Sequence, residues 1–181
     1  TYYITAATKV ILNRHFQCWK NSSYETIHKI ASGVRMFLRM SKEHFFPLTF
    51  QSEEMNCGPT CLKMVLEDFG AFYSLSELGE LTNLDSSGTS FGDLIKACSK
   101  FNIETENYKA SYDELLNEMD RPVIAHWNNN HFVVVYAMTD EFAWIADPAW
   151  GRKRYSMEEF CNEWLYGTEK NTGAGSILTF K

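Results

Sequence analysis

Residues 51–64 read Gln51-Ser-Glu-Glu-Met-Asn-Cys57-Gly-Pro-Thr-Cys61-Leu-Lys-Met64 and are the most informative stretch of the chain. Asn56 belongs to a residue type that caps helices, and Pro59 fits the first turn of a helix. Apolar residues then recur at helical spacing, at Leu62, Val65 and Phe69. Gly70 is typical of a helix end. The stretch therefore predicts a helix that begins at or next to Cys57.

A cysteine at the start of a helix is placed for nucleophilic chemistry. The free backbone N–H groups and the positive end of the helix dipole favour a thiolate there, and the thiolate is the form that attacks. Gly58 leaves space for another backbone segment to approach closely. The alternative interpretation is that Cys57 is a buried small apolar residue, as most free cysteines are. Cys61, one turn later, is predicted to face the core and to serve in packing.

The rest of the chain predicts helices first and strands afterwards. Helical spacing and Ser-x-x-acid starts predict helices over about 75–81, from Ser90, from Ser111, and from Ser156 to about Leu165. Runs of β-branched and aromatic residues predict strands over 122–127, 131–138, 142–146 and 176–180. Helices followed by an antiparallel sheet make an α+β fold.

The predicted hairpin of 131–138 and 142–146 carries the second chemical signal. If the chain turns near Thr139, His131 and Asp147 face each other with Cβ atoms ~5 Å apart, close enough for a carboxylate to orient an imidazole. Taken singly, each has a simpler interpretation: His131 as a strand-edge histidine bonded to backbone, and Asp147 as a turn residue before proline. Together with Cys57, they have the parts of a nucleophile, a base and an orienting group.

Composition and charge disfavour several classes of protein. The 181 residues are 45% hydrophobic and 22% charged, which gives enough apolar side chain for one domain with a core. No apolar run approaches the ~20 residues that span a bilayer, and no secretory signal is visible. The net charge of −6 disfavours nucleic acid as a partner. Five widely spaced cysteines, an odd number, argue against a disulfide framework and for a reducing compartment.

The first part of the chain differs from the rest in charge. Residues 1–50 carry 7 Lys and Arg against 2 Asp and Glu, whereas residues 51–181 carry 10 against 21. The run from Ser22 to Glu25 has capping-box spacing and opens a basic amphipathic pattern. We therefore expect a basic, partly helical extension over 1–45 and a separate domain over 46–181.

Several blocks of sequence agree, in order and spacing, with one family. They are Gln51 with Asn56 to Leu62, Pro122 to Trp127, His131 to Val135, and Asp147 to Gly151. Over about residues 46–181 the chain resembles the bacteriocin-processing, double-glycine leader peptidases. These are papain-like cysteine peptidase domains of peptide-exporting ATP-binding cassette transporters. The chain departs from the family at Asn56, where an acidic residue is frequent, and in its extension.

The resemblance implies a papain-like cysteine peptidase fold and a role for each of four residues. Cys57 would be the nucleophile, His131 the general base and then acid, and Asp147 the group that orients His131. Gln51 would donate to the oxyanion, an interaction worth ~3 kcal/mol. The implied substrate is a precursor peptide whose leader ends in a Gly-Gly-type pair. The implied partners are the membrane and nucleotide-binding domains of an exporter, at the cytoplasmic face of the cell membrane, and no cofactor is implied.

Two other functions stay open at this point. One is a non-catalytic module that docks the leader for an exporter. The other is a zinc module that uses Cys57, Cys61, His126 and His131, although structural zinc sites usually show tighter cysteine pairs on turns. Beside His131, the run Asn128 to Asn130 is a candidate rim loop for a leader groove.

Within the extension, the spacing of Ser23, Ile27, Ile30 and Gly33 resembles that of a double-glycine leader. One hypothesis is therefore a pseudo-substrate that occupies the groove of its own enzyme. An ordinary amphipathic helix explains the same spacing more simply. A basic helix of this kind also suits the surface of an anionic membrane.

Overall fold

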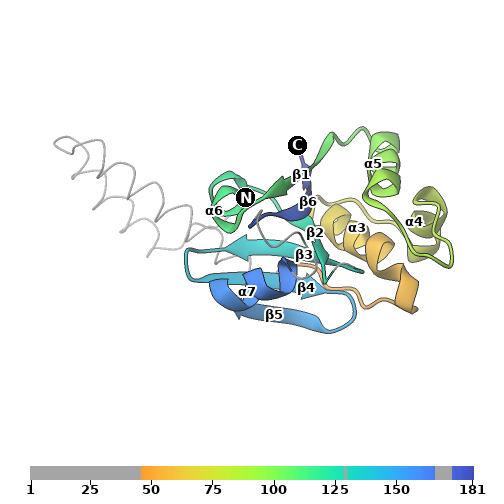
Figure 1. Ribbon diagram of the computed structural model, residues 1–181. Coiled ribbons are helices and arrows are strands. Elements are labelled where there is room, and N and C mark those ends of the chain that lie inside the picture. The colour runs from red at the N-terminus through yellow and green to blue at the C-terminus, as the bar shows by residue number, and fades with distance from the viewer. Residues whose placement is uncertain (1–45, 129, 166–172) are drawn as a thin grey trace, which may run out of the picture. The chain divides into compact units, whose positions relative to one another are not determined.

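The computed structural model describes residues 46–128, 130–165 and 173–181 (Figure 1). The predicted extension over 1–45, with its capping-box spacing and its leader-like spacing, lies outside the described residues. Across the described ranges, no helix is long and apolar enough to cross a membrane.

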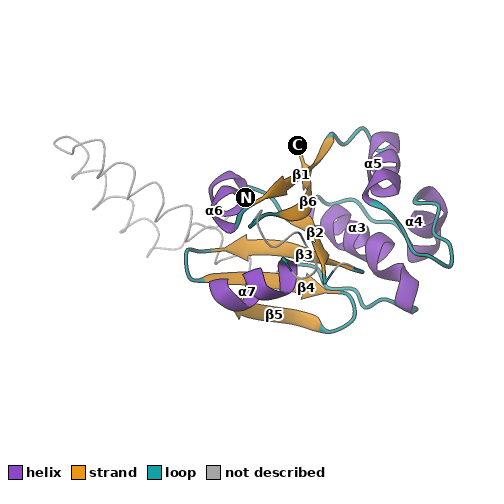
Figure 2. Cartoon of the chain, viewed as in Figure 1, coloured by secondary structure: helices purple, strands orange, loops and turns teal. Residues whose placement is uncertain are grey.

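The described residues form five α-helices, one 3-10 helix and six strands (Figure 2). The helices are η2 (Glu54–Asn56), α3 (Cys57–Asp68), α4 (Leu75–Leu81), α5 (Phe91–Lys100), α6 (Tyr112–Glu118) and α7 (Met157–Trp164). The strands are β1 (Thr105–Ala110), β2 (Val123–Trp127), β3 (His131–Met138), β4 (Phe142–Asp147), β5 (Gly151–Ser156) and β6 (Gly175–Phe180). All pairings are antiparallel, in the order β1-β6-β2-β3-β4-β5, which confirms the predicted α+β class.

Helices cover both faces of the sheet. Because successive residues of a strand point to opposite faces, Val134 of β3 packs in a core with α3, α4 and α5, whereas Val133 packs in a second core with α6 and α7. The N-terminal part of α3 lies against the start of β3, since the thiol of Cys61 is 3.2 Å from the carbonyl oxygen of Phe132. The two elements that carry Cys57 and His131 are therefore held together by the core.

The predicted helix starts are confirmed, including that of α3 at Cys57, but Asn56 does not make the expected side-chain cap. Ser90, Ser111 and Ser156 each accept a hydrogen bond from the backbone N–H three residues later. Asn56 makes no capping bond with its side chain, which donates to the Oγ of Ser52 at 2.9 Å. A capping residue is normally extended, but Asn56 has φ −83° and ψ 7° because η2 runs directly into α3.

Two strands were not predicted from the sequence, and both lie at the edges of the sheet. β1 reads Thr-Glu-Asn-Tyr-Lys-Ala and β5 reads Gly-Arg-Lys-Arg-Tyr-Ser. Edge strands commonly carry charged side chains, which discourage pairing with other molecules. Such strands lack the apolar runs on which the prediction depended.

The predicted register of the β3–β4 hairpin is also wrong, by two residues. Val134 pairs with Ala146, so His131 is not directly opposite Asp147. A bulge lies between Val135 and Ala137, and the Thr139 hydroxyl accepts the backbone N–H of Phe142 at 3.0 Å, which moves the turn beyond Thr139. Side chains alternate with a period of two. An error of two residues therefore leaves His131 and Asp147 on the same face, as diagonal neighbours.

Gly175, at the start of β6, is enclosed by the ring of Trp164. A Cβ atom there would lie 2.3 Å from Cε2 of Trp164, a side chain that is 1% exposed. We expect Gly175→Ala to lower the free energy of unfolding by about 3 kcal/mol, because neither group has space to move. The control is Gly92→Ala in α5, where the nearest atom to the new Cβ is Ser90 Oγ at 3.5 Å. Equal urea midpoints for the two variants would contradict this packing.

Candidate active site

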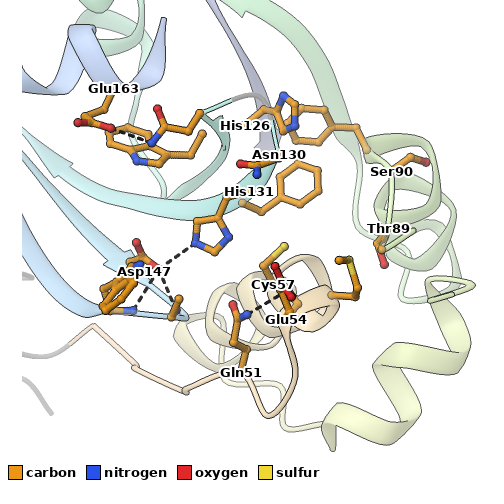
Figure 3. Close-up of a pocket in the computed structure, with 18 of the residues that line it drawn as sticks. Gln51, Glu54, Cys57, Thr89, Ser90, His126, Asn130, His131, Asp147 and Glu163 are labelled. Atoms are coloured by element: carbon orange, nitrogen blue, oxygen red, sulfur yellow. Dashed lines mark hydrogen bonds and ion pairs between the residues drawn. The ribbon is translucent and has the colours of Figure 1, made fainter. Parts of the chain in front are cut away.

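A cleft of about 940 Å³ lies where the start of α3 meets the start of β3 and the end of β4 (Figure 3). Its walls come from seven parts of the chain, namely residues 51–57, the segment 87–91, the end of β2 with the residues that follow it, the start of β3, the turn 147–150, the face of β5 that carries Lys153, and Glu163 of α7. All four candidate residues named from the sequence line it: Gln51, Cys57, His131 and Asp147. Four positions spread over nearly a hundred residues of sequence therefore meet in one place.

Cys57 is the first residue of α3 and is 7% exposed. The next residue, Gly58, allows a close approach, as predicted, although the neighbours are side chains. A Cβ atom at Gly58 would lie 3.1 Å from Cβ of Thr89 and 3.4 Å from the ring of Phe132. The absence of a side chain therefore lets the segment around Thr89 close one wall of the cleft beside the sulfur.

His131 lies between Cys57 and Asp147 (Figure 3). Its Nε2 is 2.9 Å from Oδ1 of Asp147, and the sulfur of Cys57 lies on the other side of the ring. The structure thus brings together the three residues that the sequence predicted, although they are not in the predicted strand register. The arrangement has the order of a nucleophile, a base and an orienting carboxylate.

The charges of this site reinforce one another. Burial by itself disfavours a charged imidazole, but the hydrogen bonds and charges of Asp147 and Cys57 outweigh it and raise the pKa of His131 to about 9. Burial likewise opposes the charge of Asp147, yet the bond to His131 and the backbone N–H groups of Ala149 and Trp150 lower the pKa of that carboxyl. At neutral pH the pair is therefore an imidazolium and a carboxylate.

Asp147 also organises the turn that follows it. Its Oδ1 accepts the backbone N–H of Ala149 at 2.8 Å and that of Trp150 at 3.2 Å. The residue is only 3% exposed. The simpler interpretation from the sequence, turn chemistry before proline, therefore holds as well, and it fixes the carboxylate that contacts His131.

Gln51 is anchored beside the cleft by several bonds. Its backbone N–H donates to the Pro148 carbonyl at 2.9 Å, which ties it to the turn after Asp147. Its Nε2 donates to the carbonyls of Glu53 at 3.0 Å and Glu54 at 3.1 Å. The side-chain amide thus lies near Cys57 with both of its N–H groups bonded to backbone, and its role toward an oxyanion stays a prediction.

The residues of the zinc alternative do not gather into a metal site. Cys61 is fully buried, and burial above all raises the pKa of its thiol, which agrees with the predicted packing role. His126 packs its ring against Phe91 and Phe132, and burial, followed by the charge of His131, lowers its pKa. Within the described ranges, no three His, Cys, Asp or Glu side chains could hold a metal ion together.

Some residues of the cleft were missed by the sequence reasoning. Asn128 and Asn130 line it, as the rim-loop prediction requires, while Asn129 lies outside the described residues. Thr89 and Lys153 also line it and had no signal in the sequence. Trp150 had a weak signal, because it belongs to the block from Asp147 to Gly151.

Comparison with known proteins shows which family the chain belongs to. The sequence model of the Peptidase C39 family matches residues 45–168. The chain belongs to the Peptidase C39 family. The predicted resemblance is therefore confirmed for the part of the chain that carries the four candidate residues.

Curated relatives of this C39 chain are much longer proteins. The lactococcin-G-processing and transport ATP-binding protein LagD of Lactococcus lactis subsp. lactis is 34% identical over 123 residues, which are 65% of this chain and 17% of LagD. The transport/processing ATP-binding protein ComA of Streptococcus pneumoniae is 31% identical over 134 residues, 70% of this chain and 18% of ComA. The chain thus spans less than a fifth of the length of these relatives.

Solved structures match over a larger share of their length. A double glycine motif protease from an AMS/PCAT transporter, in complex with its leader peptide, is 31% identical with a TM-score of 0.66, covering 75% of this chain and 90% of that one. The peptidase domain of Streptococcus ComA is 28% identical with a TM-score of 0.64, covering 75% and 97%. These neighbours confirm the peptidase fold and, with the family, identify the chain as a cysteine peptidase.

Proposed function

We propose that this C39 chain cuts the leader from a precursor peptide after a Gly-Gly-type pair, as part of a peptide exporter. The observation that carries the proposal is the position of His131 between Cys57 and Asp147 in one open cleft, with its Nε2 2.9 Å from Oδ1 of Asp147. The names of the relatives and of the leader-bound neighbour support the substrate class and the coupling to a transporter. The partners would be the membrane and nucleotide-binding parts of that exporter, at the inner face of the membrane.

The first half of the reaction forms an acyl-enzyme. An imidazolium beside a thiol stabilises the thiolate, so Cys57 Sγ attacks the carbonyl carbon that precedes the scissile bond, and the carbonyl electrons move to oxygen. When this intermediate collapses, the C–N bond breaks and His131 gives its proton to the leaving amine. The peptide after the cut is then released, and the leader stays bound as a thioester.

The second half restores the enzyme. Neutral His131 removes a proton from water, whose oxygen attacks the thioester carbonyl. The C–S bond breaks, the leader leaves with a new carboxylate, and Cys57 and His131 return to their charged forms. Through both halves Asp147 acts as the orienting group, because it holds Nε2 of His131 at 2.9 Å and leaves the opposite side of the ring toward Cys57.

Gln51 is the proposed side-chain donor to the oxyanion. One of its N–H groups would exchange a backbone carbonyl, that of Glu53 or Glu54, for the oxyanion when substrate binds. We expect Gln51→Ala to lower kcat by about 10²-fold, the effect of losing one preorganised donor. Cleavage kinetics measure it, and a thermal melt of the variant shows whether the fold is kept. A folded Gln51→Ala chain with full kcat would remove Gln51 from the mechanism.

The pH dependence of kcat/KM tests the state of His131. The imidazolium exists below its pKa of about 9 and is lost as pH rises through that value. Since the leaving amine needs that proton, kcat/KM is expected to fall with a descending limb near pH 9. Initial rates at constant ionic strength give the profile. A limb near 6.5, the ordinary value for histidine, would show that the coupling to Asp147 and Cys57 is absent in solution.

The direct test is mass spectrometry of a synthetic double-glycine leader peptide after incubation with the full chain. The matched control peptide has valine in place of the second glycine, which a cleft shaped for small residues excludes by overlap. Cleavage after the second glycine, and none of the control, is the expected result. If the folded chain binds the peptide and leaves it intact, the docking function takes the place of the peptidase.

A further inference from the structure

The cleavage reaction determines on which side of the cleft the peptide after the scissile bond lies. The nitrogen of His131 that faces Cys57 must reach the leaving amine, so the peptide after the scissile bond lies on the His131 side of Cys57. In Figure 3, Asp147 and Glu163 lie on this side, beyond His131, whereas Thr89 lies on the other side of Cys57. The turn after Asp147 and the strand β5 therefore border the part of the cleft that receives the released peptide.

The aromatic ring of Trp150 and the ammonium group of Lys153 lie next to each other on this side of the cleft. Trp150 is 73% exposed, and its backbone N–H is fixed to Oδ1 of Asp147 at 3.2 Å. The Nζ of Lys153 lies 5.5 Å from the centroid of the Trp150 ring. Gly151, with φ +87°, lies opposite Asp147 and permits the sharp turn into β5, in which Lys153 pairs with Ile145. Both side chains line the cleft.

The charge of Lys153 has no carboxylate partner in the part of the chain that the structure describes. Lys153 is also the sole lysine or arginine among the described residues of the cleft wall. Of the carboxylates on this side, Asp147 is paired with His131, and Glu163 accepts a hydrogen bond from Nδ2 of Asn128 at 2.8 Å. The ammonium group of Lys153, held beside the Trp150 ring, would therefore attract a negatively charged side chain of a peptide that binds on this side of the cleft.

We propose that Trp150 and Lys153 form a subsite that prefers an acidic side chain in the first residues after the cut. The proposal rests on the peptidase function above and adds a preference on the side of the released peptide. The carboxylate would pair with the Nζ of Lys153, while the stem of the same residue packs on the exposed Trp150 ring. Exposed ion pairs are weak, so the preference is expected to be about twofold to fivefold in kcat/KM.

The test uses leader peptides that differ only in the residue after the second glycine, which is Asp, Asn or Lys. We expect kcat/KM to fall in that order for the full chain and to rise in that order for Lys153→Glu, a reversal that a merely structural role cannot produce. The control is Arg154→Gln, since Arg154 lies on the same strand but over the Phe142 ring, outside the cleft.

The outcomes separate the two proposals. Equal rates for the three peptides, or a preference that Lys153→Glu leaves unchanged, would overturn the subsite while the peptidase function stands. If none of the peptides is cut, the peptidase function fails and the subsite falls with it. Added salt is expected to reduce the preference, because exposed charges are screened.

Discussion

Replacing Cys57 by alanine is expected to abolish leader cleavage, with kcat/KM lowered by roughly 10⁵- to 10⁶-fold, the cost of removing a covalent nucleophile. His131 and Asp147 would remain in place, but no atom would be left to form the thioester. The chain should still fold, because alanine at the first position of α3 removes only a small side chain. Cleavage of the leader peptide, followed by mass spectrometry, is the measurement.

A matched control separates the sulfur of Cys57 from cysteine content in general. Cys161→Ala in α7 removes a half-buried thiol outside the cleft and is expected to leave the rate unchanged. Alkylation provides a second readout, since burial raises the pKa of Cys98 to about 12 and also raises those of Cys61 and Cys161. Among the described cysteines, iodoacetamide should therefore label Cys57 first. Cleavage by Cys57→Ala at the wild-type rate would show that Cys57 is not the nucleophile.

Local sequence signals predicted the elements around the site well. Serine three residues before an acidic residue marks a helix start by chemistry that lies within one turn, and Ser90, Ser111 and Ser156 all behave as predicted. Asn56 fails because a preceding 3-10 turn, which has no sequence signal of its own, changes its backbone angles. The edge strand β5 was not predicted because its charged residues are exposed, so its sequence lacks the apolar residues that indicate a strand.

Long-range geometry was less accessible. The pairing of His131 with Asp147 was predicted from a hairpin register that a bulge and the Thr139 turn displace by two residues. The contact survives because the displacement is even and because the sheet brings diagonal neighbours within reach of an imidazole. Gln51 had no physical signal and entered through the family resemblance alone. No local pattern records that its backbone bonds to Pro148, almost a hundred residues later.

Removing the orienting carboxylate should have the second largest effect on activity. Asp147→Ala is expected to lower kcat/KM by roughly 10²- to 10⁴-fold, the range for losing general acid–base catalysis. The variant loses the bond to Nε2 of His131 and also the acceptor of the Ala149 and Trp150 N–H groups. A thermal melt must therefore accompany the kinetics, so that a loosened turn is not taken for lost catalysis.

Asp147→Asn separates orientation from charge. Asparagine keeps an oxygen that can accept the same N–H groups, and an imidazolium donates from both nitrogens, so no tautomer has to be selected. We therefore expect a smaller loss of rate, about tenfold. The charge that helps to raise the pKa of His131 is nevertheless gone, while the burial that lowers it remains. The descending limb of kcat/KM should then move from about pH 9 to lower pH. An unmoved limb would mean that Asp147 orients His131 without setting its charge.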